Sequence, residues 1–363
     1  LWRNVVSLTP ETSPDMPVRL SNLGLIMLTA LNIIPTEVNL EEAIEILRRS
    51  VDTTPEDSPD LPASMSNLGV GLIGRYARTE DLSDLKESIE IHKRAVNLAP
   101  EGSPGLFGFL SNLGTGLRAL YAHKGEINDL EKAFEIYEKA RTELDHSFSN
   151  SMVSYKLGFR RNWNRMDDDM VEIALKLRQE APQEKRIYWS QQALVTAESA
   201  KSRILTELLG RGDIPPPSSV PVELAIREFE LVRELSQMDT IDLSQVGKVA
   251  PHKEETAARM TRIERRKLLV KELETIWTKF EVFGPEAVDF VALRRGDVLS
   301  WNAIYNLIID SDPETVILSF FALANHTVLF IFREGWNGPE VVEIPLNMEE
   351  HKDIWRRFRR EIH

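Results

Sequence analysis

The apolar positions in the first part of the chain recur at the spacing of an α-helix. Residues at positions i, i+3, i+4 and i+7 lie on one face of a helix, and a mainly apolar set of this kind needs an apolar neighbour. Two such stripes lie 45 residues apart, and their members are Leu40, Ala43, Ile44 and Leu47, then Leu85, Ser88, Ile89 and His92. The pattern therefore predicts amphipathic helices that pack against one another.

A repeat of 45 residues organises these helices. The strings that return at this interval are Ser13-Pro14-Asp15, Ser58-Pro59-Asp60 and Ser103-Pro104-Gly105, and Ser21-Asn22-Leu23-Gly24, Ser66-Asn67-Leu68-Gly69 and Ser111-Asn112-Leu113-Gly114. The Ser-Pro step is expected to cap the first helix, and Pro55 and Pro100 to end the second helix. Small residues such as Gly24, Ala43 and Ser50 allow close helix contacts. We therefore expect three stacked helical hairpins with a continuous core.

These residues resemble the tetratricopeptide repeat. The likeness rests on Leu-Gly in the first helix, Ala43 in the second, Ser50 seven positions later and Pro55 five positions after that. The usual unit has about 34 residues, and the longer interval here adds about two helical turns. Strings such as Leu82-Ser-Asp-Leu85 are similar to repeats in proteins that carry a CHAT domain. The resemblance implies a groove, lined by the first helices, that binds protein segments.

The second half of the chain departs from this repeat. After Asp310 the composition favours strands, with β-rich runs at 315–323 and 327–332 around a turn at Ala324-Asn325-His326, and a further strand at 341–344. This order is similar to the opening of a CHAT domain, a caspase-like fold. The expected fold class is mainly α, a tetratricopeptide-like solenoid of helical hairpins followed by a smaller α/β segment with a β-hairpin.

The expected organisation has four parts. Repeats occupy 1–150, further helices cap the array at 151–210, a linker and charged helices fill 211–310, and a β-hairpin with a helix forms 311–363. The helices expected after the repeats are Met152–Asn164, a short one after Asp167-Asp168-Asp169, Gln183–Leu209, Val222–Gln237, Lys253–Phe283, Leu299–Ile308 and one from Met348 onward.

The candidate partner-binding residues lie on the first helices. The repeat aligns Asn22, Asn67 and Asn112, and an amide can both donate to and accept from a peptide backbone. The family resemblance implies this role, while an equally weighted alternative is that these asparagines tie neighbouring repeats together. Three nearby arginines are candidates for an acidic peptide, and three apolar residues are expected to make the groove partly apolar: Arg19, Arg75 and Arg118, with Leu20, Met65 and Leu110.

Composition narrows the classes of function. The net charge of −13 disfavours nucleic acid and anionic membranes as partners, and no apolar run approaches the roughly 20 residues of a membrane span. The absence of cysteine removes disulfides, thiolate metal ligands and a cysteine nucleophile. We therefore expect a cytoplasmic protein with no catalytic residues, metal or cofactor among these residues, while its oligomeric state stays open.

Three motifs have simpler structural interpretations. The string Gly69-Val-Gly71-Leu-Ile-Gly74 matches a dinucleotide-binding pattern, but it is predicted to lie within a helix and without the required strand. Asp167-Asp168-Asp169 fits the start of a helix better than a metal site. The basic cluster of Arg356, Arg357, Arg359 and Arg360 fits the solvated face of a helix better than a docking surface.

The main functional hypothesis is a scaffold that binds a peptide or protein in its groove and couples it to the CHAT-like segment. The alternative is the N-terminal regulatory portion of a caspase-like cysteine peptidase whose catalytic His and Cys lie beyond these residues. No histidine here matches the catalytic motif of that family. A third hypothesis is an assembly element whose groove is filled by its own chain.

Overall fold

The computed structural model describes residues 2–31, 39–99, 103, 105–148, 153–208, 215–245, 253–295, 301–302, 304–305, 315–346 and 350. The chain forms two compact units. The helical unit comprises Leu1–Leu157 and Pro215–Gly296, and the sheet unit comprises Gly158–Ile214 and Asp297–His363. The described elements are helices with a small antiparallel sheet near the C-terminal end, which confirms the expected fold class.

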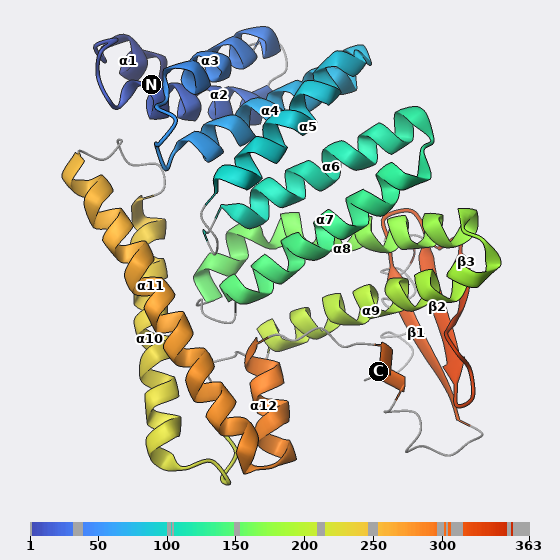
Figure 1. Cartoon of the computed structure of the whole chain (residues 1–363). Helices are drawn as coiled ribbons and strands as arrows, with labels where there is room; N and C mark the ends of the chain where they lie inside the picture. The colour runs from blue at the N-terminus through green and yellow to red at the C-terminus, as the bar shows by residue number, and fades with distance from the viewer. Residues whose placement is uncertain are drawn as a thin grey trace, which may run out of the picture. The chain divides into compact units, whose positions relative to one another are not determined.

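Three successive helical hairpins open the helical unit, and Figure 1 shows them stacked. They are α2 (Met16–Leu31) with α3 (Leu40–Thr53), α4 (Leu61–Thr79) with α5 (Leu82–Leu98), and α6 (Leu106–Lys124) with α7 (Ile127–Phe148). We call α2 to α7 the repeat array. A short helix, α1 (Trp2–Ser7), packs on α2. The 45-residue period thus corresponds to one hairpin, as predicted.

The core of the repeat array passes from one hairpin to the next. Ile44 and Leu47 of α3 belong to the same buried cluster as Leu68 and Leu72 of α4. The corresponding stripe of α5 is also buried, including the polar His92. Since each stripe contacts the next hairpin as well as its own, the hairpins stabilise one another.

The helix boundaries follow local chemistry, with one correction. Asn39 and Asp81 cap α3 and α5, because their side chains accept hydrogen bonds from the N–H groups two residues later. Helices α3 and α5 end before Pro55 and Pro100, as predicted. Ser58, however, does not cap α4. Its hydroxyl accepts from the N–H of Asp60 in the turn that precedes the helix, at 3.3 Å.

The rest of the helical unit contains α10 (Val222–Gln245), α11 (Lys253–Phe280), the 3₁₀ turn η1 (Glu281–Phe283) and α12 (Pro285–Arg295). The two charged helices are confirmed, whereas α12 was not predicted. Gly284, with φ of 106°, followed by Pro285 marks its start. Buried Glu228 of α10 and Arg294 of α12 form an ion pair at 3.1 Å. The helix expected at Leu299–Ile308 lies largely outside the described residues.

Two long helices begin the second half of the chain, α8 (Val153–Glu180) and α9 (Gln183–Leu208). Helix α9 agrees with its prediction to one residue. The prediction of a helix that begins after Asp169 was wrong, because α8 runs without a break through the three aspartates. Met166 and Met170 beside them are buried, which keeps this turn within the apolar face.

The sheet has the strand order β1-β2-β3, with β1 (Val316–Ala322), β2 (Thr327–Arg333) and β3 (Glu340–Ile344) all antiparallel. The hairpin turn closes as predicted, since the N–H of Leu323 donates to the carbonyl of His326 at 2.8 Å. Helix α9 lies against one face of the sheet (Figure 1), where Lys201 Nζ donates to Ser319 Oγ at 2.8 Å.

Within the part of the chain that the structure describes, no helix has the length and apolar character needed to cross a bilayer. The arginine cluster at 356–360 and the helix expected from Met348 lie outside the described residues.

Candidate functional site

The three predicted asparagines occupy the same position on the first helices α2, α4 and α6, and each side chain is half-buried. Asn67 Nδ2 donates to Ser21 Oγ and Asn112 Nδ2 donates to Ser66 Oγ, both at 3.0 Å. Each bond joins a first helix to the preceding first helix. This is the tie between repeats that the alternative interpretation describes, and it engages one of the two N–H groups of each amide.

Arg19 binds groups near the start of the array. Its guanidinium contacts Asp15 at 3.0 Å and donates to Thr9 Oγ1 at 2.6 Å. Thr9 is buried, and its own hydroxyl donates to the carbonyl of Val5 at 2.6 Å. Arg19 therefore joins the turn after α1 to α2.

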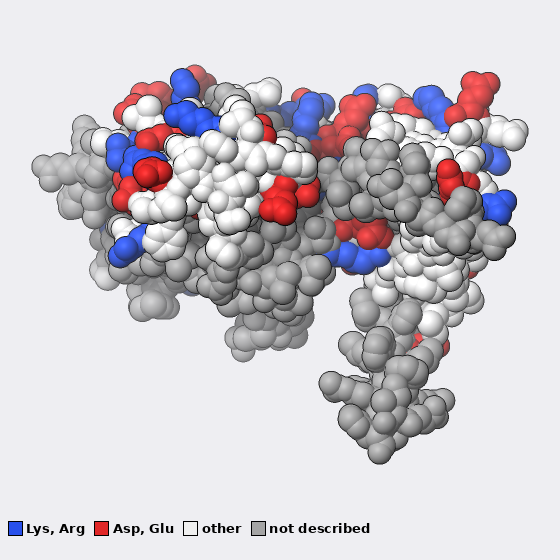
Figure 2. All heavy atoms as spheres, turned by 90° about the horizontal axis from the view of Figure 1, so that it is seen from below, with Lys and Arg blue, Asp and Glu red and all other residues white. Residues whose placement is uncertain are grey.

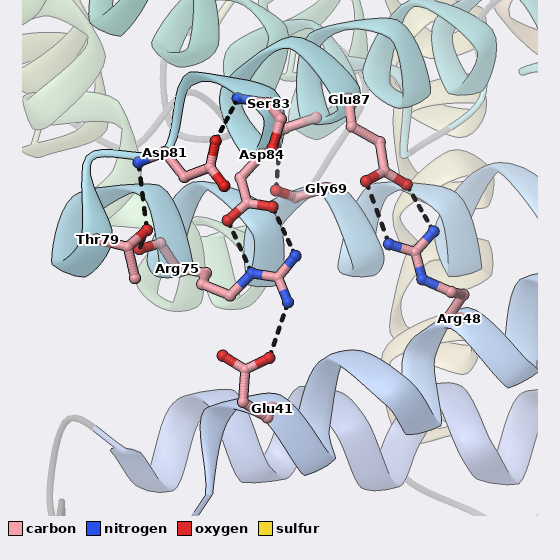
Figure 3. A network of polar contacts seen from close by, with 10 residues as sticks. Glu41, Arg48, Gly69, Arg75, Thr79, Asp81, Ser83, Asp84 and Glu87 are labelled. Carbon is pink, nitrogen blue, oxygen red and sulfur yellow. Dashed lines mark hydrogen bonds and ion pairs between the residues drawn. The ribbon is translucent and has the colours of Figure 1, made fainter.

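Arg75 joins two hairpins (Figure 3). Its guanidinium forms two hydrogen bonds with buried Asp84 of α5, at 2.7 and 2.6 Å, and one with Glu41 of α3 at 2.8 Å. These carboxylates raise the pKa of Arg75 above its usual range through hydrogen bonds, first that of Asp84 and then that of Glu41. The bidentate contact between Arg75 and Asp84 fixes the orientation of the guanidinium group as well as pairing its charge.

Arg118 is half-buried on α6 and has an interaction partner within the protein. The apolar groove residues need a correction. Leu20, Met65 and Leu110 are 1%, 2% and 4% exposed, so they belong to the core between hairpins and do not line a surface. Their positions flank the asparagines in sequence but lie on the opposite, inward face of each helix.

A contact that the sequence analysis missed joins the two helices of every hairpin. A Cβ added at Gly24 would lie 2.4 Å from Leu47 Cγ, and one added at Gly69 would lie 2.3 Å from His92 Cε1. In the third hairpin, Gly114 meets Tyr137 in the same way, at 2.8 Å. The spacing of 23 residues is the same in all three hairpins and was visible in the sequence. We call these three contacts the glycine seats.

His92 occupies the second glycine seat without any exposed surface. Burial lowers the pKa of His92 to about 4, and this outweighs the opposing effect of hydrogen bonding to the backbone of Ser66 and Ser88, which favours the charged ring. The Ser88 hydroxyl donates to the carbonyl of Gly69 at 2.9 Å and lies 3.2 Å from His92 Nδ1. Since that hydroxyl has one proton, Nδ1 is the donor to its oxygen, and His92 is neutral at pH 7.

Helices α1, α3 and α5 are joined by two ion pairs in equivalent positions. Arg48 of α3 bonds to Glu87 of α5 at 2.6 Å (Figure 3), and Arg3 of α1 bonds to Glu42 of α3 in the same relative positions. These groups are partly or fully exposed, so each pair contributes only about 0–1 kcal/mol. The two ion pairs are related by a shift of 45 residues, so they mark equivalent positions in successive units.

Charge is mixed on the face drawn in Figure 2, where basic and acidic side chains lie close to one another. Among the described residues no cluster of His, Asp or Glu has the arrangement of a metal site. Asp168 has its pKa raised to about 7, first by burial and then by the charges of Asp167, Asp169 and Glu172. The glycine motif at 69–74 lies inside α4, as predicted.

Comparison with known families gives a match within the repeat array. Residues 63–104 match the model of the tetratricopeptide repeat, and they cover most of the second hairpin. No curated protein matches the chain in sequence. Together with the stacked helical hairpins, the family match supports a tetratricopeptide repeat protein, and such repeats generally mediate contacts between proteins.

Proposed function

We propose that the repeat array is a protein-interaction scaffold that binds an extended peptide along its first helices. The observation that carries the proposal is the row of half-buried amides, Asn22, Asn67 and Asn112, at one position of three stacked helices. An amide can donate to a peptide carbonyl and accept from a peptide N–H. The spacing between first helices then sets the spacing of the captured peptide groups.

Two of the candidate arginines fit a positioning role better than direct capture of an acidic peptide. Arg75 is already paired with Asp84 and Glu41, and Arg19 with Asp15. The same contacts hold the first helices in place, and an ordered row of amides requires that order. Arg118 also has an interaction partner within the protein, and it stays a candidate contact for an acidic group of the peptide.

Two finer parts belong to the proposal. The first is that occupancy of the array is coupled to the C-terminal residues, and the second is that residues 311–363 are the opening of a CHAT-like domain. The order of helices followed by a hairpin supports the second part. A caspase-like cysteine peptidase would need a cysteine nucleophile, which the sequence given does not contain, and no observation on the described residues favours this alternative.

The test separates peptide capture from the tie between repeats. Binders are first selected from a displayed library of random peptides, and affinity is then measured for two matched double variants. N67A/N112A removes the amides, whereas S21A/S66A removes only the serine acceptors of the same two bonds. We expect N67A/N112A to weaken binding by about tenfold or more, as the loss of two hydrogen bonds implies.

S21A/S66A should bind nearly as well as the wild type. Equal losses in both double variants would show that the asparagines act only between repeats. A protein that binds no library peptide and is monomeric at every concentration would contradict the proposal. That result would support the hypothesis that the groove is filled by the chain itself.

A further inference from the structure

The two faces of the sheet differ in what covers them. Side chains on one face are buried, and they include Val328, Phe330 and Phe332. Ser319 of this face bonds to Lys201 of α9, and the ring of Phe332 contacts Trp301. The other face is apolar and open, with Val316, Leu318 and Phe320 of β1 at 49%, 54% and 50% exposed. We call the second face the outer face.

The outer face is continuous across the strands. Phe320 lies opposite Leu329 of β2, which lies opposite Val342 of β3, so this row is apolar across all three strands. Leu318 lies opposite Ile331, which lies opposite the exposed Glu340 at the rim. Side chains in such cross-strand rows are in contact. Exposed apolar side chains that lie next to one another in this way are typical of an interaction site.

The two edges of the sheet also differ. Strand β3 carries Glu340 and Glu343, and charged residues at an edge discourage pairing with another chain. Strand β1 reads Val-Ile-Leu-Ser-Phe-Phe-Ala from Val316 to Ala322, with no charge and no proline. Among the described residues no strand pairs with its far edge. This edge therefore has the features of one that pairs.

We propose that β1 pairs with β1 of a second copy of this chain, antiparallel and centred on Ser319. The strand has seven residues, so full overlap of two copies about a twofold axis places Ser319 opposite its counterpart. Each outer residue then meets an outer residue, Leu318 opposite Phe320 of the second copy, and Ile317 meets Phe321 on the inner face. A twofold contact is self-complementary and closed.

The chemistry of β1 selects this occupant. On the outer face, a strand added at this edge places its side chains beside uncharged neighbours, so charged side chains there would lose hydration without gaining a partner. On the inner face, Ser319 already bonds to Lys201 and Glu198 of α9. Strand β1 itself meets the requirement at every position. The paired sheet would have β3 at each end, and the glutamates of β3 would stop further growth into a fibre.

The experiment measures the oligomeric state of the chain by sedimentation equilibrium over a wide range of concentration, on the wild type and three variants. L318K/F320K and L318K/F320E remove the same apolar area at exposed positions. In the proposed register the first places lysine opposite lysine twice, and the second places lysine opposite glutamate twice. Opposite charges in cross-strand pairs stabilise and like charges destabilise, so the dissociation constants should differ by about 100-fold.

Val342→Lys is the control on the other edge strand, and it should leave the dimer of the wild type unchanged. Circular dichroism verifies that each variant is folded. A monomeric wild type would overturn the proposal. So would equal weakening in the two double variants, which would exclude the register, or dissociation of Val342→Lys, which would show that outer faces stack instead.

Discussion

The repeat array and the sheet unit solve the burial of apolar surface in different ways. Every hairpin of the array seats a large side chain on a glycine of its partner helix, as Leu47 does on Gly24, and the next hairpin covers what remains. The sheet covers one face with α9 and leaves Phe320 on the other face half exposed. In a repeat fold, each unit is therefore buried by the next unit of the same chain. A small sheet needs another element to bury its apolar faces.

The largest expected effect contrasts the two faces of the sheet. Phe330→Ala on the covered face should lower the free energy of unfolding by about 3–5 kcal/mol, because it empties a fully buried site. Phe320→Ala on the outer face is the matched control, and at concentrations too low for the proposed dimer it should cost less than about 1 kcal/mol. Chemical denaturation of both variants measures the difference, and similar losses would show that the outer face is also covered.

A pH effect should come from the array. His92 titrates near pH 4 when folded and near 6.5 when unfolded, so the unfolded state binds more protons between these values. Its contribution is therefore intact above pH 6.5 and is lost as the pH falls toward 4, by about 3 kcal/mol in total. His92→Leu copies Leu47 of the first seat.

The measurement compares denaturation of the wild type and His92→Leu between pH 7 and pH 4. The two curves of unfolding free energy against pH should diverge as the pH falls, with the wild type losing more. Parallel curves would show that the imidazole gains a proton without cost, in conflict with its burial.

The glycine seats can be tested within one helix. Gly69→Ala forces a methyl group against the His92 ring and should destabilise the array by about 2 kcal/mol. Gly74, in the same α4, has no atom within 4 Å of a built Cβ, so Gly74→Ala should stabilise by up to about 1 kcal/mol through helix propensity. Thermal unfolding of both variants shows whether steric contact with the partner helix or intrinsic helix propensity determines the effect of an added methyl group.

The smallest effect concerns the turn between paired helices. Glu80 has a φ of 57°, and the equivalent residue of the third hairpin is Gly125, with a φ of 72°. Side chains are strained in this region, so Glu80→Gly should stabilise by up to about 1 kcal/mol and Gly125→Ala should destabilise by a similar amount. Shifts of the same sign in the two denaturation midpoints would contradict this reason.

The sequence predicted the parts of the fold that repeat. The 45-residue period located the hairpins, and alternating β-rich runs located the strands around Ala324-Asn325-His326. It failed at Asp167-Asp168-Asp169, because a local preference for helix starts was outweighed by buried Met166 and Met170 on either side. Helix α12 was missed since its apolar residues form no long periodic stripe.

The candidate site was predictable in position but not in contacts. The period placed Asn67 and Asn112 on equivalent helices, yet their serine acceptors lie 46 residues back in sequence, and only the stacked hairpins bring these groups together. The pairing of Arg75 with Glu41 is likewise a contact between hairpins, which no local pattern encodes. Long-range polar contacts depend on register in three dimensions.

The hydrogen bonds between first helices determine which insertions the repeat array can accept. The middle unit contains both halves of a joint, since Ser66 accepts from the following unit and Asn67 donates to the preceding one, and the other two units have the same Ser-Asn pair in sequence. An in-frame duplication of one 45-residue unit would therefore supply a complete new joint, while an insertion of any other length would leave a donor facing the wrong residue. Growth by whole units is the heritable change that this architecture accepts most readily.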